Sequence, residues 1–249
     1  MKSRLVEALG LTSLPVAVIL TDAKPEGAVQ FKPDSFGCVA ASMLAVAKGK
    51  TAVFDRQTYG CPGGGFGLGF GNAYEKRCFP IEKLLSNGDS TAVPRRAHDP
   101  MIEGERFFGS EELVRRQLAS MPVTEVPTAY VVMKPLEALG EDESPALVVF
   151  LVNADQLSAL VFLSEYSRAS GEPAIAPFGG ACQSIMFGYA EAKREVPRGV
   201  IGFFDIAQRH RVSSGTLSFT VPWTLFVQME GDVAGSFLEM EDWKKLVGR

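Results

Sequence analysis

Four cysteines are the residues of this chain best suited to chemistry, because thiolates act both as metal ligands and as nucleophiles. They are Cys38, Cys61, Cys78 and Cys182. Successive cysteines are separated by 22, 16 and 103 residues, so the chain lacks the close Cys-x-x-Cys pair of zinc sites and common iron–sulfur clusters. The spacing leaves two alternatives open: inert core thiols, or four ligands of an iron–sulfur cluster or another metal.

Two of the cysteines stand in similar local sequences. Gly37-Cys38 precedes a stretch of small helix-forming residues and then an apolar strand over 51–55 that ends in Asp. Gly180-Ala181-Cys182 precedes another such stretch and a strand over 199–205 that also ends in Asp. This echo predicts that Cys38 and Cys182 lie at equivalent helix N-termini, where the helix dipole favours a thiolate or another anion.

The segment from Gly60 to Gly71 contains seven glycines in twelve positions. Such a run costs conformational entropy, and we expect a loop that turns sharply or approaches a ligand closely. The backbone N–H groups of Gly63, Gly64 and Gly65 would then serve as donors to a small-molecule ligand or cofactor beside Cys61. The alternative is a tight, flexible connection packed under a neighbouring helix. The glycine spacing matches no nucleotide-binding fingerprint.

The two histidines are His98 and His210. His98 stands in a polar loop and is interpreted as a solvated residue. His210 follows the strand that ends at Asp205, where α/β proteins often place functional groups, so we consider it either a general base or an exposed residue of a basic turn. No Gly-x-Ser-x-Gly elbow is present.

Composition narrows the class of protein. The formal charge of -4 is spread along 249 residues without a basic tract, so nucleic acid is not an expected partner. The longest apolar run, 146–152, is far shorter than the roughly 20 residues of a membrane-spanning helix. We therefore expect a soluble, cytoplasmic protein with no membrane association. Seventeen phenylalanines indicate a large core together with a homo-oligomer interface or an apolar ligand pocket.

Periodicity predicts alternating strands and helices. Strands are expected over 15–20, 51–55, 129–133, 146–152, 199–205 and 218–222, and helices over 3–10, 38–48, 111–118, 153–170 and 237–246, with a further helix after Cys182 and an acidic loop over 137–145. This order predicts an α/β or α+β fold in a single domain over 1–249. The echo extends to a pseudo-repeat of about 15–55 and about 146–205, with the two halves related by a pseudo-twofold axis.

Four short motifs resemble a known family across nearly the whole chain. They are Gly37-Cys38-Val39, Cys61-Pro62-Gly63-Gly64, Gly180-Ala181-Cys182-Gln183-Ser184-Ile185 and Phe219-Thr220-Val221-Pro222. Together they resemble the prokaryotic family called Domain of Unknown Function 169. The resemblance implies one family-wide fold and a prokaryotic cytoplasmic setting, and it transfers no catalytic residue.

The leading hypothesis is a ligand- or cofactor-binding protein. Its site would be built from the Gly60–Gly71 loop and the helix N-termini after Cys38 and Cys182, with an iron–sulfur cluster or another metal as candidate cofactor. One alternative is an enzyme of unknown reaction that uses a thiol as nucleophile, activated by a helix dipole or by His210. Another is a structural or regulatory dimer whose cysteines are buried in the core.

Overall fold

A computed structural model describes residues 2–33, 35–94 and 97–248. The chain divides into two compact units. The main unit comprises Met1–Gly71 and Thr124–Arg249, and the inserted unit comprises Asn72–Val123. The single domain predicted over 1–249 stays a prediction.

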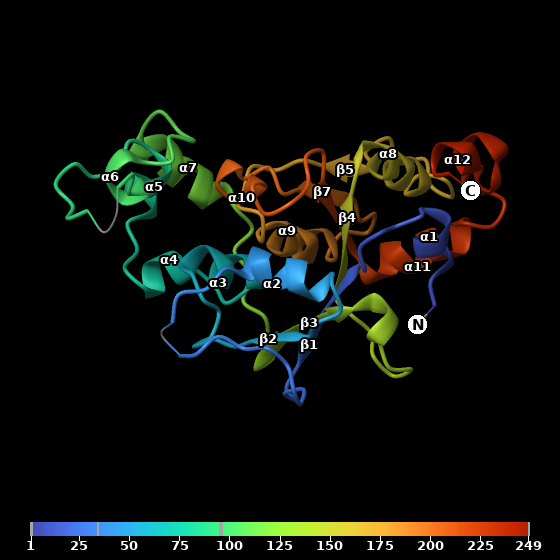
Figure 1. The fold of residues 1–249 in the computed structure, drawn as a ribbon, viewed down its shortest axis with the longest axis horizontal. Helices are drawn as coiled ribbons and strands as arrows, with labels where there is room; N and C mark the ends of the chain where they lie inside the picture. The colour runs from blue at the N-terminus through green and yellow to red at the C-terminus, as the bar shows by residue number, and fades with distance from the viewer. Residues whose placement is uncertain (1, 34, 95–96, 249) are drawn as a thin grey trace. The chain divides into compact units, whose positions relative to one another are not determined.

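The main unit is built on a mixed sheet of seven strands in the order β2-β3-β1-β4-β7-β6-β5 (Figure 1). The strands are β1 Val16–Thr21, β2 Ala52–Phe54, β3 Tyr130–Pro135, β4 Leu147–Val152, β5 Ala174–Ile175, β6 Gly199–Gly202 and β7 Leu217–Pro222. Only the β5–β6 pair is parallel among the described strands. Helices alternate with the strands, which confirms the predicted α/β or α+β class.

The helices of the main unit are α1 Arg4–Ala8, α2 Val39–Val46, α3 Pro62–Leu68, η1 Leu136–Ala138, α8 Ala154–Leu163, α9 Ser184–Glu191, α10 Ile206–Arg209, α11 Trp223–Asp232, η2 Phe237–Glu239 and α12 Glu241–Leu246. Those of the inserted unit are α4 Ala73–Lys76, α5 Ile81–Leu85, α6 Pro100–Glu103 and α7 Glu111–Ser120. In the inserted unit α5 packs against α6 and α7.

The strand order is symmetric about the antiparallel pair β1–β4, in which Ala17 is paired with Val148. Moving outward from β1, the next strands are β3 and β2; moving outward from β4, they are β7 and β6. Helix α2 lies between β1 and β2 in sequence, and α9 lies between β4 and β6. This is the order that two halves related by a pseudo-twofold axis would have, although the repeat itself stays a prediction.

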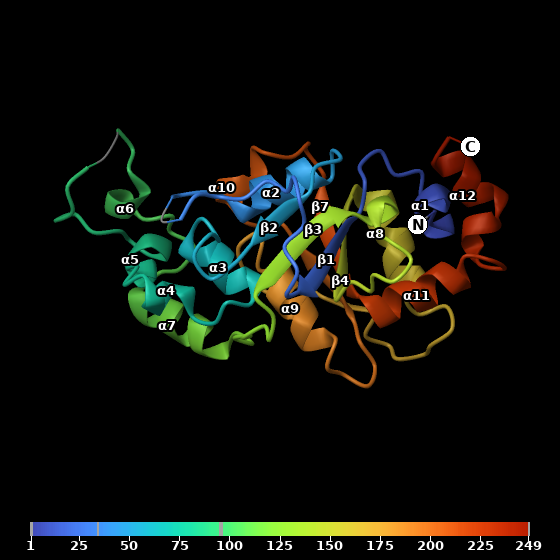
Figure 2. The same cartoon turned by 90° about the horizontal axis from the view of Figure 1, so that it is seen from below.

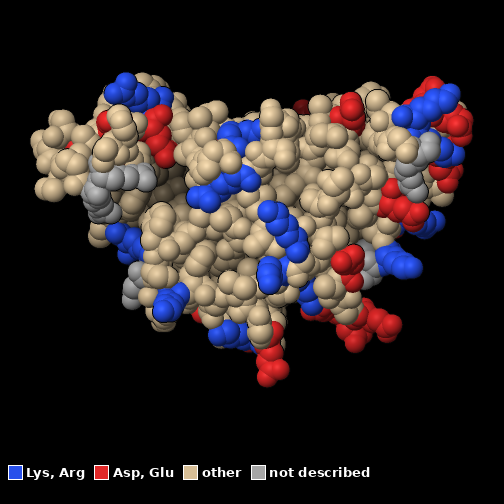
Figure 3. Space-filling view, in the orientation of Figure 1, with Lys and Arg blue, Asp and Glu red and all other residues tan. Residues whose placement is uncertain are grey.

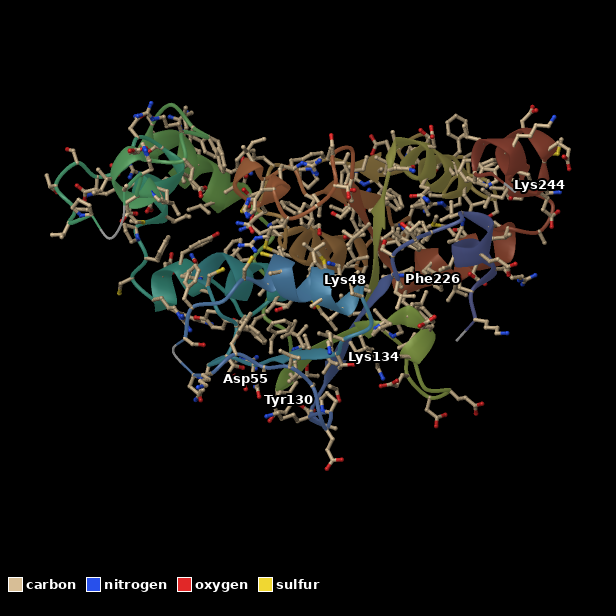
Figure 4. All side chains as sticks on the ribbon, viewed as in Figure 1. Lys48, Asp55, Tyr130, Lys134, Phe226 and Lys244 are labelled. Atoms are coloured by element: carbon tan, nitrogen blue, oxygen red, sulfur yellow. The ribbon has the colours of Figure 1, made fainter. Side chains whose placement is uncertain are left out.

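One face of the sheet carries an extensive hydrophobic core. Val148 and Phe150 of β4 and Phe219 of β7 pack there against apolar side chains of α1, α8, α11 and α12, helices that Figure 2 shows gathered beside β4. Phe226 of α11, labelled in Figure 4, stacks between Trp223 at 5.0 Å and Phe150 at 6.2 Å between ring centroids. Strand residues alternate between faces. Leu147, next to Val148, and Thr220, next to Phe219, therefore point to the opposite face.

That opposite face is covered in part by α9, and glycine allows the close approach. A Cβ atom at Gly188 would lie 2.9 Å from Leu147 Cδ1 and 3.0 Å from Thr220 Cγ2. Helix α3 in turn packs against α9. The chain segments that contain Cys61 and Cys182 are therefore held between the sheet and tightly packed helices.

Two differences from the predicted elements have local causes. The helix expected to run to about 170 ends at Leu163, because the Glu165 carboxylate accepts the N–H groups of Ser170 and Gly171 and fixes a turn. Helix α11 was not predicted. Pro222 ends β7 and at the same time serves as the N-cap residue of α11, so the strand passes directly into a helix.

Candidate functional site

Three of the four cysteines lie at equivalent places in the main unit, each at or just before the start of a helix. Cys38 is the N-cap residue of α2, and Cys61 is the N-cap residue of α3. Cys182 directly precedes Gln183, the N-cap residue of α9. All three residues are partly buried.

These three segments converge in space, and the charge of each thiolate therefore affects its neighbours. Negative charge on Cys38 raises the pKa of both Cys61 and Cys182, and negative charge on Cys61 also raises that of Cys182. The remaining contacts of the thiols are polar. The Cys38 thiol donates to Gln208 Oε1 at 3.3 Å, and the Cys182 thiol donates to the Gly63 carbonyl at 3.6 Å.

Burial is the main cause that keeps two of these thiols protonated. Desolvation raises the pKa of Cys182 well above that of an ordinary thiol, and the charges of Cys61, Cys38 and Asp205 raise it further. Desolvation also raises the pKa of Cys61, although the Gly64 N–H, which donates to Cys61 Sγ at 3.2 Å, opposes this effect. Both groups are therefore neutral thiols near pH 7.

The glycine-rich segment is a helix, so the predicted Gly60–Gly71 loop is wrong over most of its length. Helix α3 runs over Pro62–Leu68, with proline in its first turn, the Cys61 sulfur as N-cap acceptor and Gly69 in the left-handed conformation at its end. These are strong start and stop signals for a helix. Tertiary packing outweighs the low helix propensity of glycine, since most of α3 is buried.

The predicted backbone donors have defined partners within α3. The Gly64 N–H is bonded to Cys61 Sγ, and the Gly65 N–H donates to the Cys61 carbonyl at 3.0 Å. The Gly63 carbonyl accepts the Cys182 thiol, and donation from the Gly63 N–H to a ligand stays a prediction. These glycines thus shape the thiol cluster through helix geometry.

Glycines also allow the three cysteine segments to come together. A Cβ atom at Gly67 would lie 2.7 Å from the Cys182 carbonyl oxygen, and one at Gly64 would lie 2.6 Å from Val39 Cγ2. Gly60 has φ +77°, and a Cβ atom there would lie 2.6 Å from the Gly37 carbonyl oxygen. The segments bearing Cys38, Cys61 and Cys182 are therefore in direct backbone contact.

Asp205 joins the turn before α9 to helix α10. Its carboxylate is the N-cap acceptor of α10 and also reaches the Cys182 turn. The Ala207 N–H donates to Asp205 Oδ1 at 3.0 Å, the Gln208 N–H donates to the Asp205 backbone carbonyl at 2.9 Å, and the nearby Ala181 N–H helps to lower the pKa of the carboxyl. Desolvation nevertheless raises the pKa of Asp205. The buried Phe203, two residues earlier, has φ +69°, a strained conformation for a non-glycine residue that redirects the chain after β6.

Sequence reasoning missed Gln208, which the structure places beside a predicted site residue. Its Oε1 atom accepts both the Cys38 thiol and the Arg211 Nε–H, the latter at 2.7 Å. His210, considered as a base, is instead an exposed C-cap residue of α10. The sequence signals for this short helix are Asp205, a good N-cap residue, and the basic turn that begins four residues later at Arg209.

Two further predicted residues, Cys78 and His98, belong to the inserted unit. Cys78 is exposed and follows α4 with φ +48°. His98, in the same unit, is exposed beside Glu103. Across residues 2–33, 35–94 and 97–248, no three His, Cys, Asp or Glu side chains are arranged to hold a metal ion.

The sequence of this chain matches a known protein family. Residues 4–232 match the model of the DUF169 family, described as "Uncharacterised ArCR". The match covers nearly the whole sequence, so the chain belongs to this family, as its motifs predicted. No curated protein and no solved structure matches the chain. Within the described residues, no helix is long and apolar enough to cross a membrane.

Proposed function

We propose that this protein binds a cofactor through the thiolates of Cys38, Cys61 and Cys182, and that the cofactor is an iron–sulfur cluster or a single thiophilic metal ion. The observation that carries the proposal is that three cysteine-bearing segments from distant parts of the sequence are in contact with one another. Soft metals and iron–sulfur clusters select thiolate ligands.

The protonation of the thiols supports a ligand role over a nucleophilic one. Nucleophilic cysteines are activated by a lowered pKa, whereas burial raises the pKa of Cys61 and Cys182. A metal cation would displace these protons and offset the mutual repulsion of three thiolates. The Gly64 N–H already donates to Cys61 Sγ, as second-sphere donors do around metal-bound sulfur.

The described arrangement is open and requires closure around a metal. No three potential ligands among the described residues are arranged to hold an ion, so the sulfur atoms would have to move toward a common centre. Three protein ligands leave a further coordination position on the metal for a fourth ligand. A small molecule bound there would make the cluster a reaction centre, and a fourth protein ligand would make it structural.

The test is to purify the protein without oxygen, record its visible spectrum and measure iron, acid-labile sulfide and zinc. The same measurements are made on Cys38→Ser, Cys61→Ser and Cys182→Ser, with Cys78→Ser as the matched control. Near-stoichiometric metal in the wild type and the control, with loss in each of the other three variants, supports the proposal. Charge-transfer bands with iron and sulfide identify a cluster, and colourless protein with zinc identifies a single ion.

Equal metal content in all five proteins contradicts the proposal. So does metal-free wild-type protein that gains none after reconstitution with iron and sulfide or with zinc. Homo-oligomer formation stays a separate prediction, which a concentration-dependent mass measurement on the same samples tests.

A further inference from the structure

A cavity in the main unit is lined by polar as well as apolar side chains and contains no cysteine. Its volume is about 630 Å³. It lies between the segment before β1, the C-terminal end of α2, the start of α8 and the segment after α10. A cavity of this size accommodates a small organic molecule.

The charged groups of this cavity favour an anion. The side chains of Lys48 and Arg211 line it, and Asp155 is the only acidic residue among its lining residues. The net formal charge is therefore +1. In the part of the chain that the structure describes, the Lys48 ammonium and the terminal Nη groups of Arg211 have no carboxylate partner. Figure 3 shows basic side chains over α2 and beside α10 on this face, and Figure 4 labels Lys48.

A hydrogen bond holds the Arg211 side chain in place for binding an anion. Its Nε–H donates to Gln208 Oε1 at 2.7 Å, which fixes one edge of the guanidinium group. The fork of Nη groups remains for a bidentate acceptor, and phosphate oxygens match that fork well. Hydroxyl groups from two loops, those of Thr12, Ser213, Ser214 and Thr216, also line the cavity and add neutral donors.

The start of α8 supplies a third positive contribution. Asn153 and Gln156 form a capping box, in which each side chain accepts the backbone N–H of the other residue. The backbone N–H groups of Asn153 and Gln156 are therefore already bonded, whereas the backbone N–H of Asp155 has no acceptor among the described residues. A helix of ten residues places partial positive charge at this end, beside the cavity.

We infer that this cavity binds the phosphate group of a small phosphorylated molecule, with Lys48 and Arg211 as the principal ligands. The Asp155 carboxylate opposes the anion and sets an upper limit on its affinity. The site is separate from the proposed metal centre, because no cysteine lines the cavity. Failure of one proposal therefore leaves the other intact.

The experiment measures binding of inorganic phosphate and ribose 5-phosphate to the full chain by calorimetry at low ionic strength. Lys48→Met and Arg211→Met are each expected to weaken binding by about tenfold or more, which corresponds to about 1.4 kcal/mol. Asp155→Asn is expected to strengthen it severalfold. Lys50→Met is the matched control, because Lys50 is exposed, close in sequence and not a lining residue, yet its loss changes the net charge equally.

The pattern across these variants decides the outcome. Saturable binding that follows the order Asp155→Asn, wild type, then Lys48→Met and Arg211→Met supports the site. Absence of saturable binding for both probes overturns the inference. Equal weakening in Lys50→Met also overturns it, because general attraction to the basic face would then explain the binding. Circular dichroism on each variant verifies that the fold is retained.

Discussion

A Cβ atom placed at Gly67 would lie 2.7 Å from the carbonyl oxygen of Cys182. Backbone of α3 thus touches backbone of the turn before α9, although 115 positions separate the two residues in sequence (182 minus 67). Because Cys61 starts α3, this contact fixes the distance between two of the three clustered thiols.

Gly67→Ala is expected to destabilise the protein and disturb the cluster. The contact is backbone against backbone, so no side chain can move aside, and overpacking of this kind costs about 1–3 kcal/mol. Chemical denaturation measures the loss, and cofactor content is expected to fall in parallel. Gly231→Ala is the control, because Gly231 lies in α11 with open space around it and alanine there should be neutral or stabilising.

Alkylation at pH 7 is expected to modify Cys78 rapidly and Cys61 and Cys182 slowly. Cys78 is exposed, whereas desolvation raises the pKa of the other two. Mass spectrometry of peptides after timed labelling of metal-free protein gives the three rates. Rates for Cys61 and Cys182 should still be rising at pH 9, the ordinary thiol pKa. Rapid labelling of either one at pH 7 would contradict the assignment.

The same raised pKa values predict how stability depends on pH. A folded-state pKa above the unfolded value means that the folded protein binds the proton more tightly, so this contribution is complete below about pH 9 and is lost as pH rises further. Denaturation of metal-free protein should therefore show falling stability above pH 9. The double variant Cys61→Ser, Cys182→Ser should show a shallower fall.

Asp205→Asn is expected to make Cys182 more reactive. The charge of Asp205 is one of the causes that raise the pKa of Cys182, and asparagine removes the charge while keeping an oxygen acceptor for the N–H groups of α10. The alkylation rate of Cys182 near pH 8 should increase, and that of Cys78 should not change. An unchanged Cys182 rate would contradict the effect of the Asp205 charge on this thiol.

In the inserted unit, Lys83→Met is expected to raise the pKa of Asp89. The Lys83 ammonium donates to Asp89 at 2.6 Å, and together with Thr91 it lowers the pKa of this carboxyl to about 2. The lowered value means that the stabilisation is present above about pH 4 and is lost as pH falls toward 2. Carboxyl NMR titration of both proteins measures the shift, and a midpoint that stays near 2 in the variant would contradict it.

Several features of this protein are determined by the sequence locally. Alternating and continuous apolar runs predicted β1, β3, β4 and β7 close to their observed bounds, because side-chain burial on a sheet follows directly from a period of two. The small-residue stretches after Cys38 and Cys182 predicted helices whose N-terminal ends carry these residues. Family motifs spread over the chain predicted its membership of DUF169.

Other features are decided only by the tertiary structure. Proline and glycine mark the start and end of α3, but the low helix propensity of its interior glycines hides it, and tertiary packing that leaves no room for a side chain at Gly67 decides that the helix forms. The sequence set Cys38, Cys61 and Cys182 apart by their local sequences, but long-range backbone contacts decide that their segments meet. Gln208 and Arg211 acquire their roles in the same way, since hydrogen-bond partners depend on distances that separation along the chain does not fix.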